Sequence, residues 1–127
     1  MIYKVLVVDD SKLARMSFAK LMSKLRPDWV RLEAANAEEA MGVIASDKPD
    51  VVILDFNMPG RDGLDIATEL QELHPQIPVA VISANIQVEV VSRATAAGAV
   101  FLPKPLTEQA LAEFLDISGP RLAALGT

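Results

Sequence analysis

Five short apolar runs, rich in valine, isoleucine and leucine, alternate along the chain with longer segments of mixed polarity. Their length and β-branched content predict strands, and runs of continuous apolar residues are typical of strands covered on both faces of a parallel sheet. We expect strands at residues 4–8, 30–34, 51–54, 79–82 and 100–102. The run at 30–34 alternates apolar and polar residues, as a half-covered strand near a sheet edge does.

The segments between these runs carry apolar residues at the three- and four-residue spacing of an amphipathic helix. In the first segment, one helix face is formed by Ala14, Phe18, Leu21, Met22 and Leu25. Caps and helix breakers bound the segments. We expect helices over about residues 11–26, 36–48, 64–74, 86–97 and 107–117.

Local signals refine two of the expected helices. Asn36, followed by Glu39 three residues later, is typical of a capping box at a helix start. The helix over 86–97 begins with several β-branched residues, which have weaker helix propensity. This helix therefore depends on tertiary packing, and we expect it to be the pliable one.

The alternation of strands and helices predicts an α/β fold, with a parallel sheet covered by helices on both faces and joined by right-handed crossovers. A length of 127 residues and a hydrophobic content of 51% suit a single domain. We expect a domain core over about residues 4–116, followed by a short extension over 117–127 that begins near Ser118-Gly119-Pro120. All strands of a parallel sheet end at one edge, so side chains at the strand ends are expected to meet there.

Composition excludes several kinds of site. The chain has no cysteine, which rules out disulfides, zinc thiolate sites and thiol nucleophiles. A formal net charge of -5 argues against direct DNA binding, because the phosphate backbone favours a basic surface. The first residues lack the apolar run of a signal peptide, and no segment approaches membrane-spanning length. We therefore expect a cytoplasmic protein that does not bind a membrane.

Polar and charged residues stand at the ends of four predicted strands. Asp9-Asp10 follows the first strand, Asp55 the third and Ser83 the fourth, and Lys104 lies just after the last strand. Each alone is also consistent with a helix cap or an ordinary loop residue. Because open α/β sheets bind ligands at the carboxyl ends of their strands, the set together indicates a joint chemical role.

With these motifs, the sequence resembles the receiver domain of two-component response regulators (CheY-like). The matching positions, in order and spacing, are Asp9-Asp10, residues 51–60, Ser83-Ala84 and Lys104-Pro105. The resemblance extends from Lys4 to about Leu115. It implies a flavodoxin-like (βα)5 doubly wound sandwich, with a five-stranded parallel sheet of order 2-1-3-4-5. It also implies a stand-alone signalling domain whose only catalysis is its own phosphorylation and slow dephosphorylation.

The acidic residues have a chemistry that fits this resemblance. Clustered carboxylates repel one another, so their grouping predicts a hard cation between them, and Mg²⁺ favours such oxygen ligands. The resemblance implies that Asp55 is the phosphoacceptor and acts as a nucleophile. It implies that Asp9 and Asp10 hold Mg²⁺ directly or through water, and that Asn57 contributes its backbone carbonyl.

The remaining matched residues are expected to act after phosphorylation. Lys104 and Ser83 are expected to contact the phosphate through an ammonium charge and a hydroxyl hydrogen bond. Phe101 matches the family's aromatic switch position, and its ring is expected to turn inward as Ser83 moves towards the phosphate. The output surface is then formed by the fourth helix, the fifth strand and the fifth helix. Ser83 stands where threonine is commoner, and the Lys104-Pro105 bond is expected to be cis.

The resemblance also implies partners. The phosphoryl donor is expected to be a sensor histidine kinase or a histidine phosphotransfer protein, and the output a changed affinity for a downstream protein target. We expect a monomer or a phosphorylation-dependent dimer.

Three alternatives are weighed against this interpretation. One is a pseudo-receiver that binds partners without phosphorylation, which usually lacks part of the acidic set or the lysine. An aspartate-nucleophile phosphatase of the haloacid dehalogenase type needs a second aspartate two residues after the first, where this chain has Asn57. A flavin carrier is least favoured, because no Ser/Thr/Gly-rich phosphate loop follows the first strand.

Overall fold

The computed structural model describes residues 3–58, 62–84 and 87–125. Within them, five parallel strands form one sheet in the order β2-β1-β3-β4-β5, which confirms the predicted order. The strands are β1 Lys4–Val8, β2 Val30–Ala34, β3 Val51–Asp55, β4 Val79–Ser83 and β5 Val100–Pro103. Asp55 and Ser83 are therefore the last residues of their strands, and their backbones are held in the sheet.

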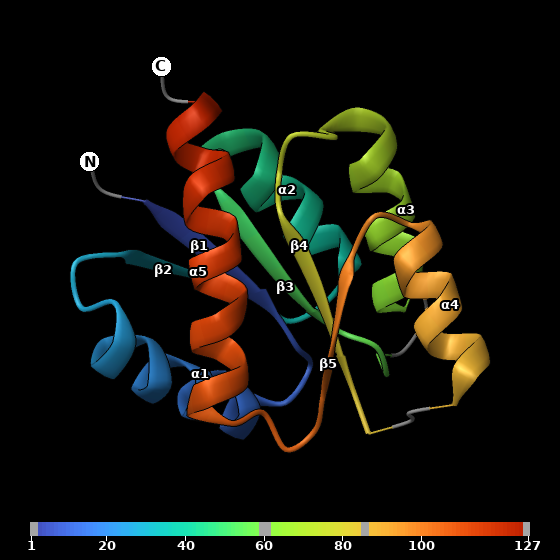
Figure 1. Ribbon diagram of the computed structural model, residues 1–127, viewed down its shortest axis with the longest axis horizontal. Helices are drawn as coiled ribbons and strands as arrows, with labels where there is room; N and C mark the ends of the chain where they lie inside the picture. The colour runs from blue at the N-terminus through green and yellow to red at the C-terminus, as the bar shows by residue number, and fades with distance from the viewer. Residues whose placement is uncertain (1–2, 59–61, 85–86, 126–127) are drawn as a thin grey trace.

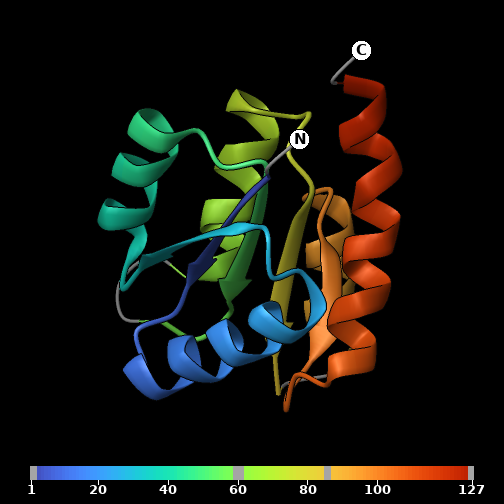
Figure 2. The same ribbon diagram turned by 90° about the vertical axis from the view of Figure 1, so that its left-hand side faces the viewer.

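One helix follows each strand, and the five helices cover both faces of the sheet (Figure 1, Figure 2). They are α1 Lys12–Leu25, α2 Ala37–Asp47, α3 Gly63–Leu73, α4 Val88–Ala96 and α5 Glu108–Leu125. The helices α1 and α5 pack on one face, and α2, α3 and α4 pack on the other. The predicted doubly wound α/β architecture is thus confirmed. No helix in the described ranges combines the length and apolar character needed to cross a membrane.

Alternation along each strand divides the interior into two cores. In β1, Val5 and Val7 belong to the core beneath α1 and α5, which also contains Phe114. Leu6 and Val8 belong to the core beneath α2, α3 and α4. Every residue of β3 and β4 is buried, because helices cover both faces of these central strands. The rigid middle of the sheet therefore ends directly at the predicted site.

Side-chain caps begin four of the helices, at Ser11, Asn36, Asp62 and Thr107, and one of them differs in part from the prediction. Asn36 accepts a hydrogen bond from the backbone of Glu39 at 2.8 Å, but the Glu39 carboxylate accepts from the backbone of Ala35. The predicted capping box at this position is therefore wrong in its second half. A reciprocal capping box occurs instead between Asp62 and Asp65 at the start of α3, where its two short side chains reach each other's backbone.

The helix α5 is longer than expected: it continues to Leu125 and includes most of the residues expected to form a short extension over 117–127. Ser118 is buried, and its hydroxyl donates to the carbonyl of Phe114 at 2.9 Å. This bond satisfies the serine hydroxyl within the helix, so Ser118 does not end α5. Figure 1 shows α5 as a long helix running along the sheet. Residues 126–127 lie outside the described part.

The predicted pliable helix, α4, begins at Val88; of the segment expected from 86, residue 86 lies outside the described residues. Gln87 occupies the cap position but makes no side-chain capping bond. At the other end, Gly98 has φ +75°, a left-handed conformation that suits glycine and ends the helix as predicted. The start of α4 therefore lacks the side-chain cap that α1, α2 and α3 have.

Candidate functional site

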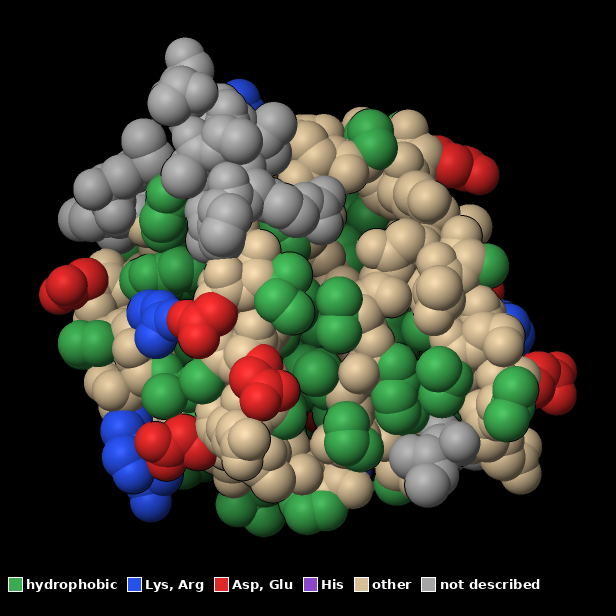
Figure 3. Space-filling view, viewed as in Figure 1, with side chains coloured by type: hydrophobic (Ala, Val, Ile, Leu, Met, Phe, Trp, Pro, Cys, Tyr) green, Lys and Arg blue, Asp and Glu red, His purple; other side chains and the backbone are tan. Residues whose placement is uncertain are grey.

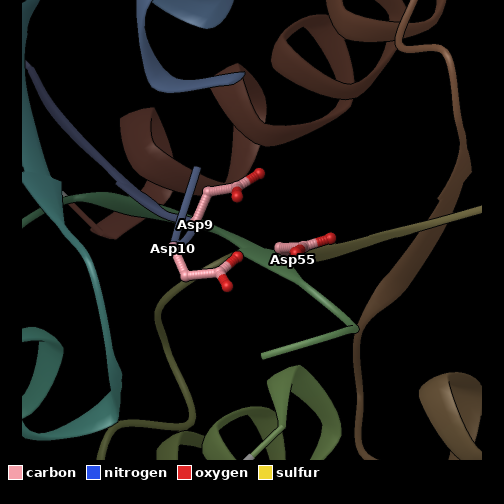
Figure 4. Close-up of side chains that lie close together, drawn as sticks. All are labelled: Asp9, Asp10 and Asp55. Atoms are coloured by element: carbon pink, nitrogen blue, oxygen red, sulfur yellow. The ribbon is translucent and has the colours of Figure 1, made fainter. Parts of the chain in front are cut away.

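Three carboxylates converge at the carboxyl ends of β1 and β3 (Figure 4). Asp9, Asp10 and Asp55 each offer an oxygen atom, and these atoms all lie within 4.8 Å of one another. Asp9 and Asp55 are 6% and 3% exposed, whereas Asp10 is exposed. The cluster thus has two buried acids at its base and one at the solvent boundary, in a shape open to a small ion.

The loop that carries Asp9 is held from several sides. The N–H of Asp9 donates to the carbonyl of Ala34 in β2 at 3.0 Å, and the Asp9 carboxylate accepts from the N–H of Ser11 at 2.9 Å. The guanidinium of Arg15 donates to the carbonyl of Asp9 at 2.7 Å and to the carboxylate of Glu33 at 3.0 Å. These bonds tie the start of α1 to the end of β2 and fix the backbone of the acidic pair.

Asp55 forms an ion pair with Lys104, the residue that follows β5. The Lys104 ammonium lies 2.7 Å from a carboxylate oxygen of Asp55. The N–H of Lys104 donates to the carbonyl of Ser83 at 3.0 Å, which continues the pairing between β4 and β5 beyond Pro103. The peptide bond to Pro105 is cis, as predicted. One lysine thus balances part of the negative charge of the cluster.

Gly63 brings the start of α3 against the end of β3. Its N–H donates to the carbonyl of Phe56 at 3.2 Å, and a Cβ atom at this position would lie 2.4 Å from the carbonyl oxygen of Asp55. Only glycine permits such an approach without a shift of the backbone. Gly63 and Arg15 support the site but were missed in the sequence. The only local signal for Gly63 was its place after Asp62 at a helix start.

The burial of Asp9 affects its ionisation. Burial raises the pKa of Asp9, the hydrogen bond from Ser11 opposes this effect, and the nearby charge of Asp55 raises the pKa further. A bound cation would favour the ionised form and reverse the effect of the two acidic neighbours. The cluster is therefore electrostatically unfavourable by itself and suited to a positive ligand.

The remaining predicted residues lie around this cluster. Ser83 is fully buried at the end of β4, one residue beyond Ile82, which is the register partner of Asp55. Phe101 lies in β5 and is half-buried against the core beneath α2, α3 and α4. Asn57 is exposed, two residues after Asp55. The structure thus brings Asp9, Asp10, Asp55 and Lys104 together, while the roles of all seven residues stay predictions.

Comparison with protein families identifies this arrangement. The family model for the response regulator receiver domain matches residues 5–116. The chain belongs to this family. Receiver domains act in two-component signal transduction, so membership supports signalling over the phosphatase and flavin-carrier alternatives.

Relatives of known identity include regulatory proteins from two bacteria. The receiver domain is 44% identical over 115 residues to the positive alginate biosynthesis regulatory protein of Pseudomonas aeruginosa, covering 87% of this chain and 45% of that protein. It is 34% identical over 119 residues to the transcriptional regulatory protein PdtaR of Mycobacterium tuberculosis, covering 93% and 57%. The chain therefore spans about half the length of the curated relatives that it matches.

Solved receiver structures have the same fold. The chemotaxis protein CheY4 of Vibrio cholerae superposes with a TM-score of 0.83 at 25% sequence identity. The match covers 93% of this chain and 99% of that structure. The receiver domain thus has the CheY-like arrangement of strands and helices over nearly its whole length.

Proposed function

We propose that this receiver domain accepts a phosphoryl group on Asp55 from the phosphohistidine of a sensor histidine kinase or a histidine phosphotransfer protein. A carboxylate oxygen of Asp55 forms the new P–O bond as the P–N bond breaks, and the histidine nitrogen keeps the electron pair. One observation carries the proposal: Asp55 is 3% exposed at a rigid strand end, with the Lys104 ammonium 2.7 Å from its oxygen. The lysine is poised to compensate charge on an incoming phosphoryl group.

The donor set also supports a magnesium site. Three carboxylates offer oxygen atoms within 4.8 Å of one another, and hard divalent cations bind such oxygen ligands. We infer that Asp9, Asp10 and Asp55, with the backbone carbonyl of Asn57, hold Mg²⁺. The bound ion would neutralise negative charge on the phosphoryl group during transfer.

The proposed response starts at Ser83, whose hydroxyl donates a hydrogen bond to the phosphoryl group. Ser83 then moves towards Asp55, and Phe101, which is only half-buried in β5, turns inward. This movement changes the surface formed by α4, β5 and α5, where a downstream protein binds. In support, hydrophobic side chains gather over β5 between α4 and α5 (Figure 3), and Val100 of β5 is 38% exposed.

Phosphoryl transfer is tested with a small-molecule phosphodonor and Mg²⁺. The wild-type domain is expected to gain one acid-stable, base-labile phosphate, detected by intact-protein mass spectrometry. Asp55→Asn is expected to gain none, and Asp65→Asn, which alters an acid of the α3 cap, is expected to gain it as wild type does. A wild-type domain that remains unmodified would refute the proposal and favour a pseudo-receiver.

The switch is tested separately by partner capture. Immobilised receiver domain, with and without beryllofluoride and Mg²⁺, is incubated with candidate target proteins. Beryllofluoride imitates the phosphoryl group, so it is expected to change the bound partners in wild type and not in Asp55→Asn. Identical capture in both states would rule out a switch at this surface.

A further inference from the structure

A single arginine connects the acidic loop to the neighbouring strand. Arg15, in the first turn of α1, has a side chain that is only 17% exposed. Its Nη1 donates to the backbone carbonyl of Asp9 at 2.7 Å, and its Nε donates to the carboxylate of Glu33 in β2 at 3.0 Å. The planar guanidinium presents its donors in a fixed fork, so these two bonds define its orientation.

The carbonyl that Arg15 contacts belongs to the peptide unit between Asp9 and Asp10. On the other side of Asp9, its N–H donates to the carbonyl of Ala34 at 3.0 Å. Both peptide units that flank Asp9 are thereby restrained. Because Asp10 is exposed, its carboxylate owes its direction chiefly to the backbone, and that backbone is oriented by Arg15.

We propose that Arg15 is a positioning residue for the metal site, holding the Asp9-Asp10 peptide so that both carboxylates face a common ligand. The inference rests on the proposed function, since it concerns the same magnesium site. Arg15 itself does not touch the ion. It acts through a backbone carbonyl, and Glu33 both orients the guanidinium and offsets its charge.

A positioning role and a purely electrostatic role for Arg15 predict opposite changes in Mg²⁺ affinity when Arg15 is replaced by alanine. A positive guanidinium beside an acidic cluster repels a divalent cation, so its removal should tighten Mg²⁺ binding if only charge mattered. If Arg15 orients the peptide, its removal should weaken binding, although one positive charge has been lost. Arg15→Lys separates the two effects further, because it keeps the charge and loses the fork.

The experiment is a calorimetric titration with Mg²⁺ at constant ionic strength, using wild type, Arg15→Ala, Arg15→Lys and Arg26→Ala. Arg26 is a matched control at the other end of α1: it donates to the carbonyl of Leu25 at 2.8 Å and to the carboxylate of Asp116 at 2.7 Å. Both Arg15 variants are expected to weaken Mg²⁺ binding about tenfold, the effect of losing an outer-shell partner. Arg26→Ala is expected to bind Mg²⁺ as wild type does.

Thermal unfolding without metal shows whether each variant is folded before titration. If Arg15→Ala does not fold, Arg15→Lys carries the comparison. Tighter binding by Arg15→Ala, or wild-type binding by Arg15→Lys, would overturn the positioning role while leaving the magnesium site in place. A wild-type domain that binds no Mg²⁺ would overturn both this inference and the metal site on which it rests.

Discussion

The two ends of the same sheet edge are built differently. At β1, the acidic loop is restrained by Ser11, by Arg15 and by the neighbouring strand β2. At β4 and β5, the following helix α4 starts at Gln87 without a side-chain capping bond. The acidic loop is thus held by side-chain bonds, whereas the described start of α4 has no side-chain cap, and we expect the start of α4 to change more easily.

The C-terminal end of α4 is held by a neighbouring helix. The side-chain amide of Gln71 in α3 lies 3.0 Å from the carbonyl oxygen of Ala97 and 3.3 Å from that of Ala96, and with its nitrogen on that side it would donate to both. These bonds satisfy carbonyl groups that a helix end leaves free. The difference suggests that α4 is fixed near its C-terminus and adjustable near its N-terminus, which is the end closer in sequence to Ser83.

The largest expected effect comes from Asp9 in the restrained region. At 100 times the dissociation constant, Mg²⁺ is expected to stabilise wild type by about 2.7 kcal/mol. Asp9→Asn should lose most of this gain, because a ligand and a charge are removed. Urea unfolding with and without Mg²⁺ measures the effect, with Asp116→Asn on the exposed face of α5 as the control. An undiminished gain in Asp9→Asn would contradict the assigned ligand set.

The stability of Asp9→Asn without metal is expected to depend on pH differently from that of wild type. Because burial raises the pKa of Asp9, the folded domain holds its proton to a higher pH than the unfolded chain does. Stability is then lost as pH rises from the ordinary aspartate value through the higher folded value. Asp9→Asn cannot ionise, so it should lack this loss and be more stable than wild type at pH 7 without metal. Parallel stability curves for both proteins over this range would contradict the prediction.

Gly63→Ala should have the next largest effect, at the end of β3 beside the acidic loop. The added Cβ would lie 2.4 Å from the carbonyl oxygen of Asp55, so α3 or the end of β3 must shift, at a cost of about 2 kcal/mol. Phosphorylation of Asp55 should also slow. Gly42→Ala is the matched control: its Cβ would meet nothing within 4 Å, and it should stabilise α2 by about 0.5–1 kcal/mol. Equal stability of the two variants would show that the approach at Gly63 is not required.

Gln71→Ala should loosen the anchored end of α4 without affecting the acidic loop. Loss of the bonds to Ala96 and Ala97 is expected to cost about 1 kcal/mol, which corresponds to roughly fivefold faster amide exchange in α4. Hydrogen exchange measured by mass spectrometry should show no change in α1. Gln109→Ala, which removes an exposed bond to Glu113, is the control. Unchanged exchange in α4 would argue against an anchor at Gln71.

Gln87→Asp should make the two regions more alike, with the smallest effect. Aspartate at a helix N-cap can accept a backbone hydrogen bond and interact favourably with the helix dipole, a gain of about 0.5–1 kcal/mol. Amide exchange near the start of α4 should slow, and α1 should again be unaffected. If amide exchange near the start of α4 does not slow in this variant, the start of α4 is already held as well as that of α1.

Much of the fold followed from local periodicity. The alternating runs predicted all five strands and a parallel sheet, because strand and helix repeats differ enough to be separated in sequence. The order of the strands was implied by the family resemblance. The same reasoning placed Asp9, Asp10, Asp55 and Lys104 at one edge, since parallel strands end together. The predicted end of α5 was wrong, because Ser118 was interpreted as a helix boundary. Its bond to the carbonyl of Phe114 forms only once the helix is present, so the sequence pattern does not reveal it.

The sequence by itself determined which residues stand at the strand ends, and so which chemical groups share the site. Only the tertiary structure decided how they are held: Arg15 bridges to Glu33 across 18 positions, Gly63 lies against Asp55, and Gln71 caps a helix on another element. The physical reason is that periodicity reports the face on which a residue lies, whereas these contacts depend on how crossovers bring separate elements together. The chemistry of the acidic cluster can thus be predicted from the strand ends, but its supports become visible only in the folded chain.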